Sequence, residues 1–152
     1  MLMLLNTFSE RAQILWGILF KSESSVIRGK DSRPRRGVDV LSEECNKFVT
    51  EAETEAKSGD HSLSAERWKS AAFCYSDAEN FVKASECFKN SAEESLKGKN
   101  KAGASDSLLC ASMVLIRSGK KEEASTIIKF AESKGLGGTD NMKFAADFLK
   151  AI

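Results

Sequence analysis

Residues 65–89 read AERWKSAAFCYSDAENFVKASECFK, and this stretch decides the fold. Small and aromatic side chains recur every three to four residues on either side of a turn-like DAEN, which is the spacing of two amphipathic helices. The positions that set this spacing are Trp68, Ala72 and Tyr75 before the turn and Ala84 and Phe88 after it. Two antiparallel helices are therefore predicted, in which the alanines allow close approach and the aromatic rings fill the gaps around them.

The pattern returns 40 residues later, where residues 105–129 read SDSLLCASMVLIRSGKKEEASTIIK. The matched pairs are Trp68 with Leu108, Ala71 with Ala111, Tyr75 with Leu115, Ala84 with Ala124, and Phe88 with Ile128. Such self-similarity at a fixed period is typical of stacked helical hairpins. The repeat therefore predicts an array rather than a single hairpin.

Apolar stripes of helical period extend this reading to most of the chain. They predict helices near 41–58, 63–78, 80–97, 101–118, 121–134 and 140–151, and no strand-like alternation is found. Ser42, Ser62 or Ser64, and Thr139 are the expected N-caps, whereas Gly59, Gly119 and Gly135 are expected to end helices. The predicted fold is all-α, an α-solenoid of about five to six helices over residues 40–152.

Residues 1–39 differ in composition and are predicted to be a separate extension. An apolar and aromatic stretch over 1–21 is followed by a basic segment that contains Pro34. Four interpretations remain open: a membrane-surface helix, an organelle transit peptide, a helix that docks on the core, and a gene-model extension with no structural role. The apolar run is too short to span a bilayer.

Charge and cysteine usage exclude several classes of function. The chain has 23 Lys and Arg against 22 Asp and Glu, a net charge of +1, so no global field attracts nucleic acid. Cys45, Cys74, Cys87 and Cys110 form no CxxC pair, and they are predicted to be small core residues of a reduced, intracellular protein. His61, the only histidine, is predicted to be a solvated loop residue or a cap, and Glu94 to lie on a helix surface. No metal site, cofactor or enzymatic activity is predicted.

The first hairpin carries a family pattern. Trp68, Ala71-Ala72, Tyr75, Ala84 and Phe88 resemble the W–LG–Y–A–F positions of a tetratricopeptide repeat at the right internal spacing. The resemblance implies a protein-binding module. A spacing of 40 residues exceeds the usual 34 of that repeat, so longer helices or connections are expected.

That longer spacing points to one branch. The stretch from FVTEAETEAKSGD to LIRSGKKEEA, residues 48–124, is similar to the N-terminal half of the soluble NSF attachment proteins (SNAPs), and the resemblance extends over about 41–134. Residues 135–152, GLGGTDNMKFAADFLKAI, are similar more weakly to a short helix near their C-terminal domain. The resemblance implies an adaptor for vesicle fusion and intracellular protein transport. It would bind the SNARE four-helix bundle, engage an NSF-type ATPase, and be cytoplasmic and peripheral on membranes.

Candidate contact residues follow from this resemblance. The residues expected to attract an acidic coiled coil are Arg67, Lys69, Lys83, Lys99, Lys101 and Arg117. Opposite charge raises the rate of such an association. The loop at 59–62 lacks the exposed phenylalanines with which the family touches membranes, and Phe8, Trp16 and Phe20 are the candidates to replace them.

A generic tetratricopeptide scaffold or co-chaperone adaptor is the alternative. Members that bind C-terminal carboxylates need polar residues in their groove, where this chain has Phe73, Leu109 and Met113 beside Lys69 and Arg117. A carboxylate clamp is therefore not expected. An apolar groove that grips a helical or peptide client, with Phe73 and Met113 as anchors, remains open.

Overall fold

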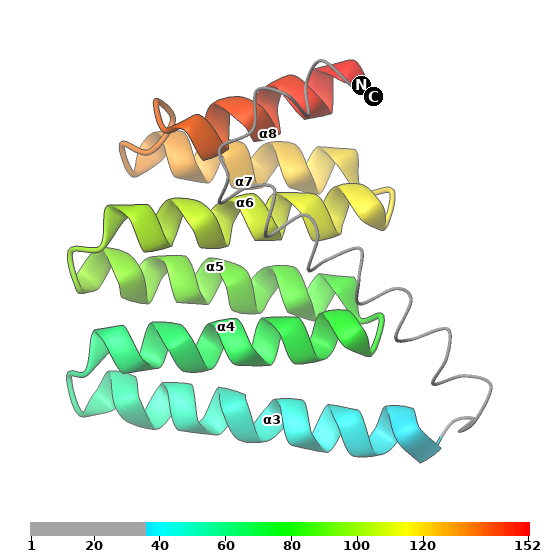
Figure 1. Ribbon diagram of the computed structural model, residues 1–152, viewed down its shortest axis with the longest axis vertical. Coiled ribbons are helices and arrows are strands. Elements are labelled where there is room, and N and C mark those ends of the chain that lie inside the picture. Colours follow the sequence, from blue (N-terminus) through cyan, green and yellow to red (C-terminus); the bar gives the residue numbers. More distant parts are fainter. Residues whose placement is uncertain (1–35) are drawn as a thin grey trace.

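The computed structural model describes residues 36–152, with side-chain environments from Ser42 onward. The helices over this range are α3 (Arg36–Lys57), α4 (His61–Asp77), α5 (Phe81–Lys97), α6 (Lys101–Arg117), α7 (Lys121–Ser133) and α8 (Asp140–Ala151), as Figure 1 shows. The predictions for Phe8, Trp16 and Phe20 lie outside the described residues.

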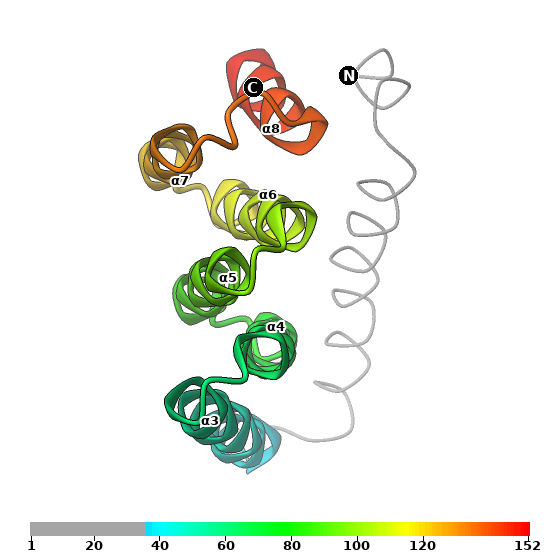
Figure 2. The same cartoon turned by 90° about the vertical axis from the view of Figure 1, so that its left-hand side faces the viewer.

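The helices form two layers. Seen along the helices, α3, α5 and α7 lie on one side and α4, α6 and α8 on the other (Figure 2). Each helix packs against the next along the chain, and α6 also contacts α8. The all-α prediction is confirmed, and the arrangement is consistent with an array of helical hairpins.

The helices and turns repeat with half the 40-residue period that is visible in the sequence. α4, α5, α6 and α7 begin at His61, Phe81, Lys101 and Lys121, so α4, α5 and α6 each occupy 20 residues together with the turn that follows. In the turn after each of α3 to α6 the middle residue has a positive φ: 87° at Gly59, 60° at Glu79, 60° at Lys99 and 78° at Gly119. The 40-residue repeat is therefore two copies of one helix-and-turn unit.

Two predicted helix starts are wrong. α3 begins at Arg36, so Ser42 lies inside the helix, and residues 36–39 are helical rather than part of the flexible linker predicted before residue 40. α4 is capped by Asp60, whose carboxylate accepts a hydrogen bond from the Leu63 N–H at 3.1 Å. Ser64 is buried, and its hydroxyl donates to the Ala52 carbonyl of α3 at 2.8 Å instead. A capping serine and a serine that bonds to a neighbouring helix look alike in sequence.

The predicted interior residues lie where two helices cross. Ala71, Ala72, Ala84 and Phe88 are each 0% exposed, and Tyr75 is 3% exposed. Buried serines add hydrogen bonds between helices: the Ser91 hydroxyl of α5 lies 2.8 Å from the Ala65 carbonyl of α4 and 3.2 Å from the Ser107 hydroxyl of α6. Because the Ser91 and Ser107 hydroxyls are paired, serine can replace alanine at this crossing with little desolvation cost, whereas the buried Ser76 hydroxyl has no such partner.

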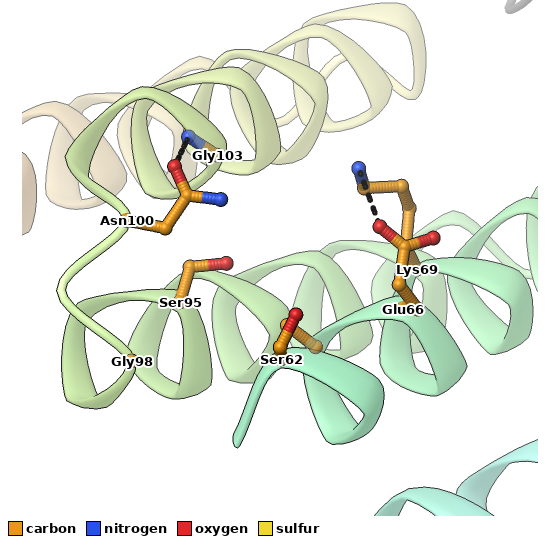
Figure 3. Close-up of a pocket in the computed structure, with 8 residues that line it drawn as sticks. Ser62, Glu66, Lys69, Ser95, Gly98, Asn100 and Gly103 are labelled. Carbon is orange, nitrogen blue, oxygen red and sulfur yellow. Dashed lines mark hydrogen bonds and ion pairs between the residues drawn. The ribbon is translucent and has the colours of Figure 1, made fainter. Parts of the chain in front are cut away.

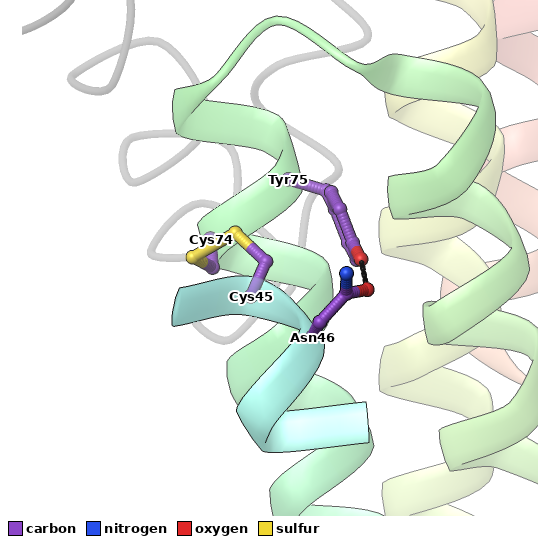
Figure 4. The surroundings of a disulfide bond; sticks show 4 residues. All are labelled: Cys45, Asn46, Cys74 and Tyr75. Atoms are coloured by element: carbon purple, nitrogen blue, oxygen red, sulfur yellow. Dashed lines mark hydrogen bonds between the residues drawn. A yellow bond between two sulfur atoms is a disulfide. The ribbon is translucent and has the colours of Figure 1, made fainter. Parts of the chain in front are cut away.

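The expectation that all four cysteines are reduced is wrong for one pair. Cys45 of α3 and Cys74 of α4 form a disulfide, with their Cα atoms 5.4 Å apart (Figure 4). Cys87 and Cys110 are buried free thiols, and burial raises the pKa of each to about 12. Helical periodicity places a cysteine on a face of its own helix but does not say which residue of the next helix it meets.

Candidate partner-binding surface

A small pocket lies where α4 passes the turn between α5 and α6 (Figure 3). Its volume is about 70 Å³, and it is lined by Ser62, Ala65, Glu66, Lys69, Ser95, Gly98, Asn100 and Gly103. The Lys69 ammonium faces the Glu66 carboxylate at 4.0 Å. Metabolite sites usually exceed roughly 300 Å³. The pocket is therefore too small for such a ligand.

One of the predicted basic residues lines this pocket, and two more adjoin a lining residue in the chain. Lys69 lines it from α4, and Lys99 and Lys101 flank Asn100, which lines it from the turn. The Asn100 side chain accepts a hydrogen bond from the Gly103 N–H at 2.9 Å and thereby caps α6. Lys99 and Lys101 are exposed. We call Lys69, Lys99 and Lys101 the basic cluster.

The other predicted cations lie elsewhere. Arg67 faces α3, where its Nε is 3.3 Å from Glu51, and both side chains are largely exposed. The Lys83 ammonium lies 5.2 Å from the centre of the Tyr75 ring. The Arg117 guanidinium lies 4.9 Å from the centre of the Phe81 ring, at the opposite end of α6 from Lys101. These three side chains therefore do not extend the basic cluster.

The predicted apolar groove is mostly interior. Met113 is 5% exposed and Leu109 is 1% exposed, and both belong to the hydrophobic core. Phe73 is partly buried and packs edge-on against Phe88, with ring centres 5.1 Å apart. Of Phe73, Leu109 and Met113, only Phe73 has a partly exposed side chain that a client could contact.

A buried carboxylate was missed by the sequence reading. Glu94 is 6% exposed rather than on the helix surface, and its carboxylate lies 2.7 Å from His61 Nδ1 and 2.9 Å from the Lys97 ammonium. Burial by itself would raise the pKa of Glu94, but the hydrogen bonds from Lys97 and His61 outweigh it and hold the pKa below the usual range of a glutamate. The contacts among His61, Glu94 and Lys97 join the start of α4 to the end of α5. His61 and Glu94 are 33 positions apart, so local spacing carries no signal for it.

A second basic surface lies on the other layer of the array. The Phe130 ring of α7 is flanked by the ammonium groups of Lys89, at 4.7 Å from its centre, and Lys134, at 5.5 Å. Phe130 is partly buried against the core. Such cation–π contacts fix lysines that would otherwise be mobile.

Within 36–152, no group of three or more histidine, cysteine, aspartate or glutamate side chains could hold a metal ion. No helix in the described part of the chain is long and apolar enough to cross a membrane.

Comparison with known proteins adds no relative. No protein-family model, curated protein or solved structure matches the chain.

Proposed function

We propose that this chain is a protein-binding adaptor of SNAP type, which engages SNARE complexes in vesicle fusion and intracellular transport. The observation that carries the proposal is the basic cluster at Lys69, Lys99 and Lys101, set on an array of stacked helices in a chain whose net charge is only +1. A local cluster on a nearly neutral chain directs an acidic partner to one place.

The regularity of the scaffold supports the same proposal. The segment that resembles SNAPs, residues 48–124, falls within α3 to α7. Ala72 and Ala84 are 0% exposed at the helix crossing, as the packing of a tetratricopeptide-like hairpin requires. Rows of antiparallel helices offer an extended surface that suits an elongated partner such as a helical bundle. Engagement of an NSF-type ATPase and peripheral contact with membranes are parts of this proposal that rest on the resemblance alone.

The test is a titration of the full chain against an assembled SNARE four-helix bundle at low and moderate salt. The variant Lys69→Glu/Lys101→Glu reverses two charges of the basic cluster. The control Lys89→Glu/Lys134→Glu makes the same charge change on the other layer. We expect saturable binding that weakens with salt, an affinity about tenfold lower for the first variant, and little change for the control.

Each contrary result has a definite meaning. Absence of binding by the unaltered chain would refute the SNARE assignment. Equal losses in the two variants would show that net charge rather than the basic cluster determines affinity. Repeating the titration with lipid vesicles tests membrane contact, because a membrane-binding chain would then bind the bundle more tightly.

A generic tetratricopeptide-type scaffold is the second candidate. The specific observation in its favour is the partly exposed Phe73 beside Lys69 on α4, which pairs an aromatic anchor with a charge. Clients of such scaffolds are helices or extended peptides. In this case Phe73→Ala would weaken client binding more than Lys69→Glu would, whereas the SNAP-type proposal expects the reverse order.

A further inference from the structure

α3 is the first helix of the described array, and it buries little apolar surface. Among its described side chains only Cys45 and Ala52 are buried apolar residues, both 0% exposed. Phe48 and Val49 are only partly buried. Its main neighbour is α4. A helix at the end of the described array with so few buried apolar contacts opens more easily than the interior of the array.

The contacts that hold α3 fall into two groups along its length. Near its C-terminus the Ala52 carbonyl accepts the Ser64 hydroxyl at 2.8 Å, and Glu51 pairs with Arg67 at 3.3 Å. The three-residue turn at 58–60 also ties this end to α4. The C-terminal half of α3 therefore stays attached without any covalent link.

The N-terminal half depends on the disulfide and on one hydrogen bond beside it. Cys45 is bonded to Cys74, and the next residue, Asn46, accepts a hydrogen bond from the Tyr75 hydroxyl at 2.5 Å (Figure 4). Both links reach the same turn of α4. The sulfur bridge closes a loop between residues 29 positions apart, so its loss releases considerable chain entropy.

We propose that the Cys45–Cys74 bond is a reversible lock, which fixes the N-terminal half of α3 to α4 when oxidised and releases it when a small thiol such as glutathione reduces the bond. Reduction leaves α4 to α8 folded. It loosens the segment N-terminal to Ala52 and uncovers the surface of α4 around Tyr75.

The two sulfurs differ in access, and this sets the order of the chemistry. Cys74 is partly buried, whereas Cys45 is 0% exposed, so a thiolate attacks the Cys74 Sγ. The S–S bond breaks, Cys45 leaves as a thiolate and takes a proton, and a mixed disulfide forms at Cys74. A second small thiol attacks that mixed disulfide and releases the Cys74 thiol together with the oxidised small-molecule disulfide. The protein gains two electrons and two protons, and the two small thiols lose them.

The remaining cysteines do not compete in this exchange. Cys87 is 5% exposed and Cys110 is 2% exposed. Burial raises the pKa of both thiols to about 12, so little thiolate is present near neutral pH.

The experiment compares oxidised and glutathione-reduced samples of the full chain. Alkylation followed by mass spectrometry counts the thiols, and hydrogen exchange follows the backbone. We expect exchange in residues 42–50 to be at least about tenfold faster after reduction, while residues 81–97 of α5 change less than about twofold. The variant Cys45→Ser/Cys74→Ser should exchange like the reduced chain and should not respond to thiol.

Three outcomes would overturn the proposal. The first is equal exchange in residues 42–50 of the oxidised and reduced chain. The second is an equal rise in the exchange rate of α5, which would show that the bond stabilises the whole array rather than α3 alone. The third is resistance of the native bond to glutathione when the same bond in the unfolded chain is reduced.

Discussion

The four repeated turns allow the cost of a left-handed residue to be measured inside one protein. In each turn the middle residue donates its N–H to the carbonyl three residues earlier at 3.0–3.1 Å, so the geometry is shared. Two turns have glycine at this position, Gly59 and Gly119, and two have a side chain, Glu79 and Lys99. We predict that Lys99→Gly stabilises the protein and that Gly119→Ala destabilises it.

The magnitudes follow from the backbone. A left-handed conformation costs an L-residue roughly 1–2 kcal/mol. Glycine avoids this cost, but it loses about 0.5–1 kcal/mol more conformational entropy on folding because it is more flexible in the unfolded chain. Lys99→Gly should therefore raise the free energy of unfolding by about 0.5–1 kcal/mol. Gly119→Ala should lower it by a similar amount, since a Cβ there would meet no atom within 4 Å and adds no clash.

The measurement is urea unfolding followed by circular dichroism, with the disulfide kept oxidised in every sample. The transition midpoint should rise for Lys99→Gly and fall for Gly119→Ala at an unchanged slope, and the melting temperature should move by roughly 2–4 °C per kcal/mol. The double variant should return close to the parent value. A lower midpoint for Lys99→Gly, or an unchanged one for Gly119→Ala, would show that backbone strain does not distinguish the turns.

Three more predictions concern buried groups. Phe88→Ala removes a fully buried ring and should cost about 3–5 kcal/mol in urea unfolding, whereas Phe88→Leu should cost much less. The pKa of Glu94 is lowered in the fold, so its contribution to stability is present above the usual pKa of a glutamate and is lost as the pH falls through the lowered pKa; Glu94→Gln should flatten this part of the stability profile. Cys87 and Cys110 should resist iodoacetamide at about pH 8 in the native reduced chain and react only after unfolding, as counted by mass spectrometry.

Much of the fold could be read from local pattern. From α5 onward, every helix lies within one or two residues of its predicted bounds, because apolar periodicity and turn residues are properties of short segments. The start of α3 is the exception. Its first turn contains Arg36 and Gly37, and Pro34 and Arg35 come just before it. Together these residues have the composition of a linker.

The candidate surface was predicted only in part. Residue type and position singled out Lys69, Lys99 and Lys101, but nothing in the sequence says that Lys69 of α4 lines one pocket with Asn100, which lies between the other two lysines. Met113 has the spacing of a groove residue and is nevertheless 5% exposed, because α6 is contacted by α5, α7 and α8. Burial of a helix face depends on how many neighbours cover it, and periodicity alone does not count them.

The sequence by itself determined the helices, their turns and the repeat, since each depends on residues within a few positions of one another. Only the tertiary structure decided which side chains meet across helices: the Cys45–Cys74 bond, the His61–Glu94 contact and the Ser64–Ala52 hydrogen bond. These partners are 12 to 33 residues apart. Their meeting depends on the rotation and offset of neighbouring helices, which the packing of all side chains sets together.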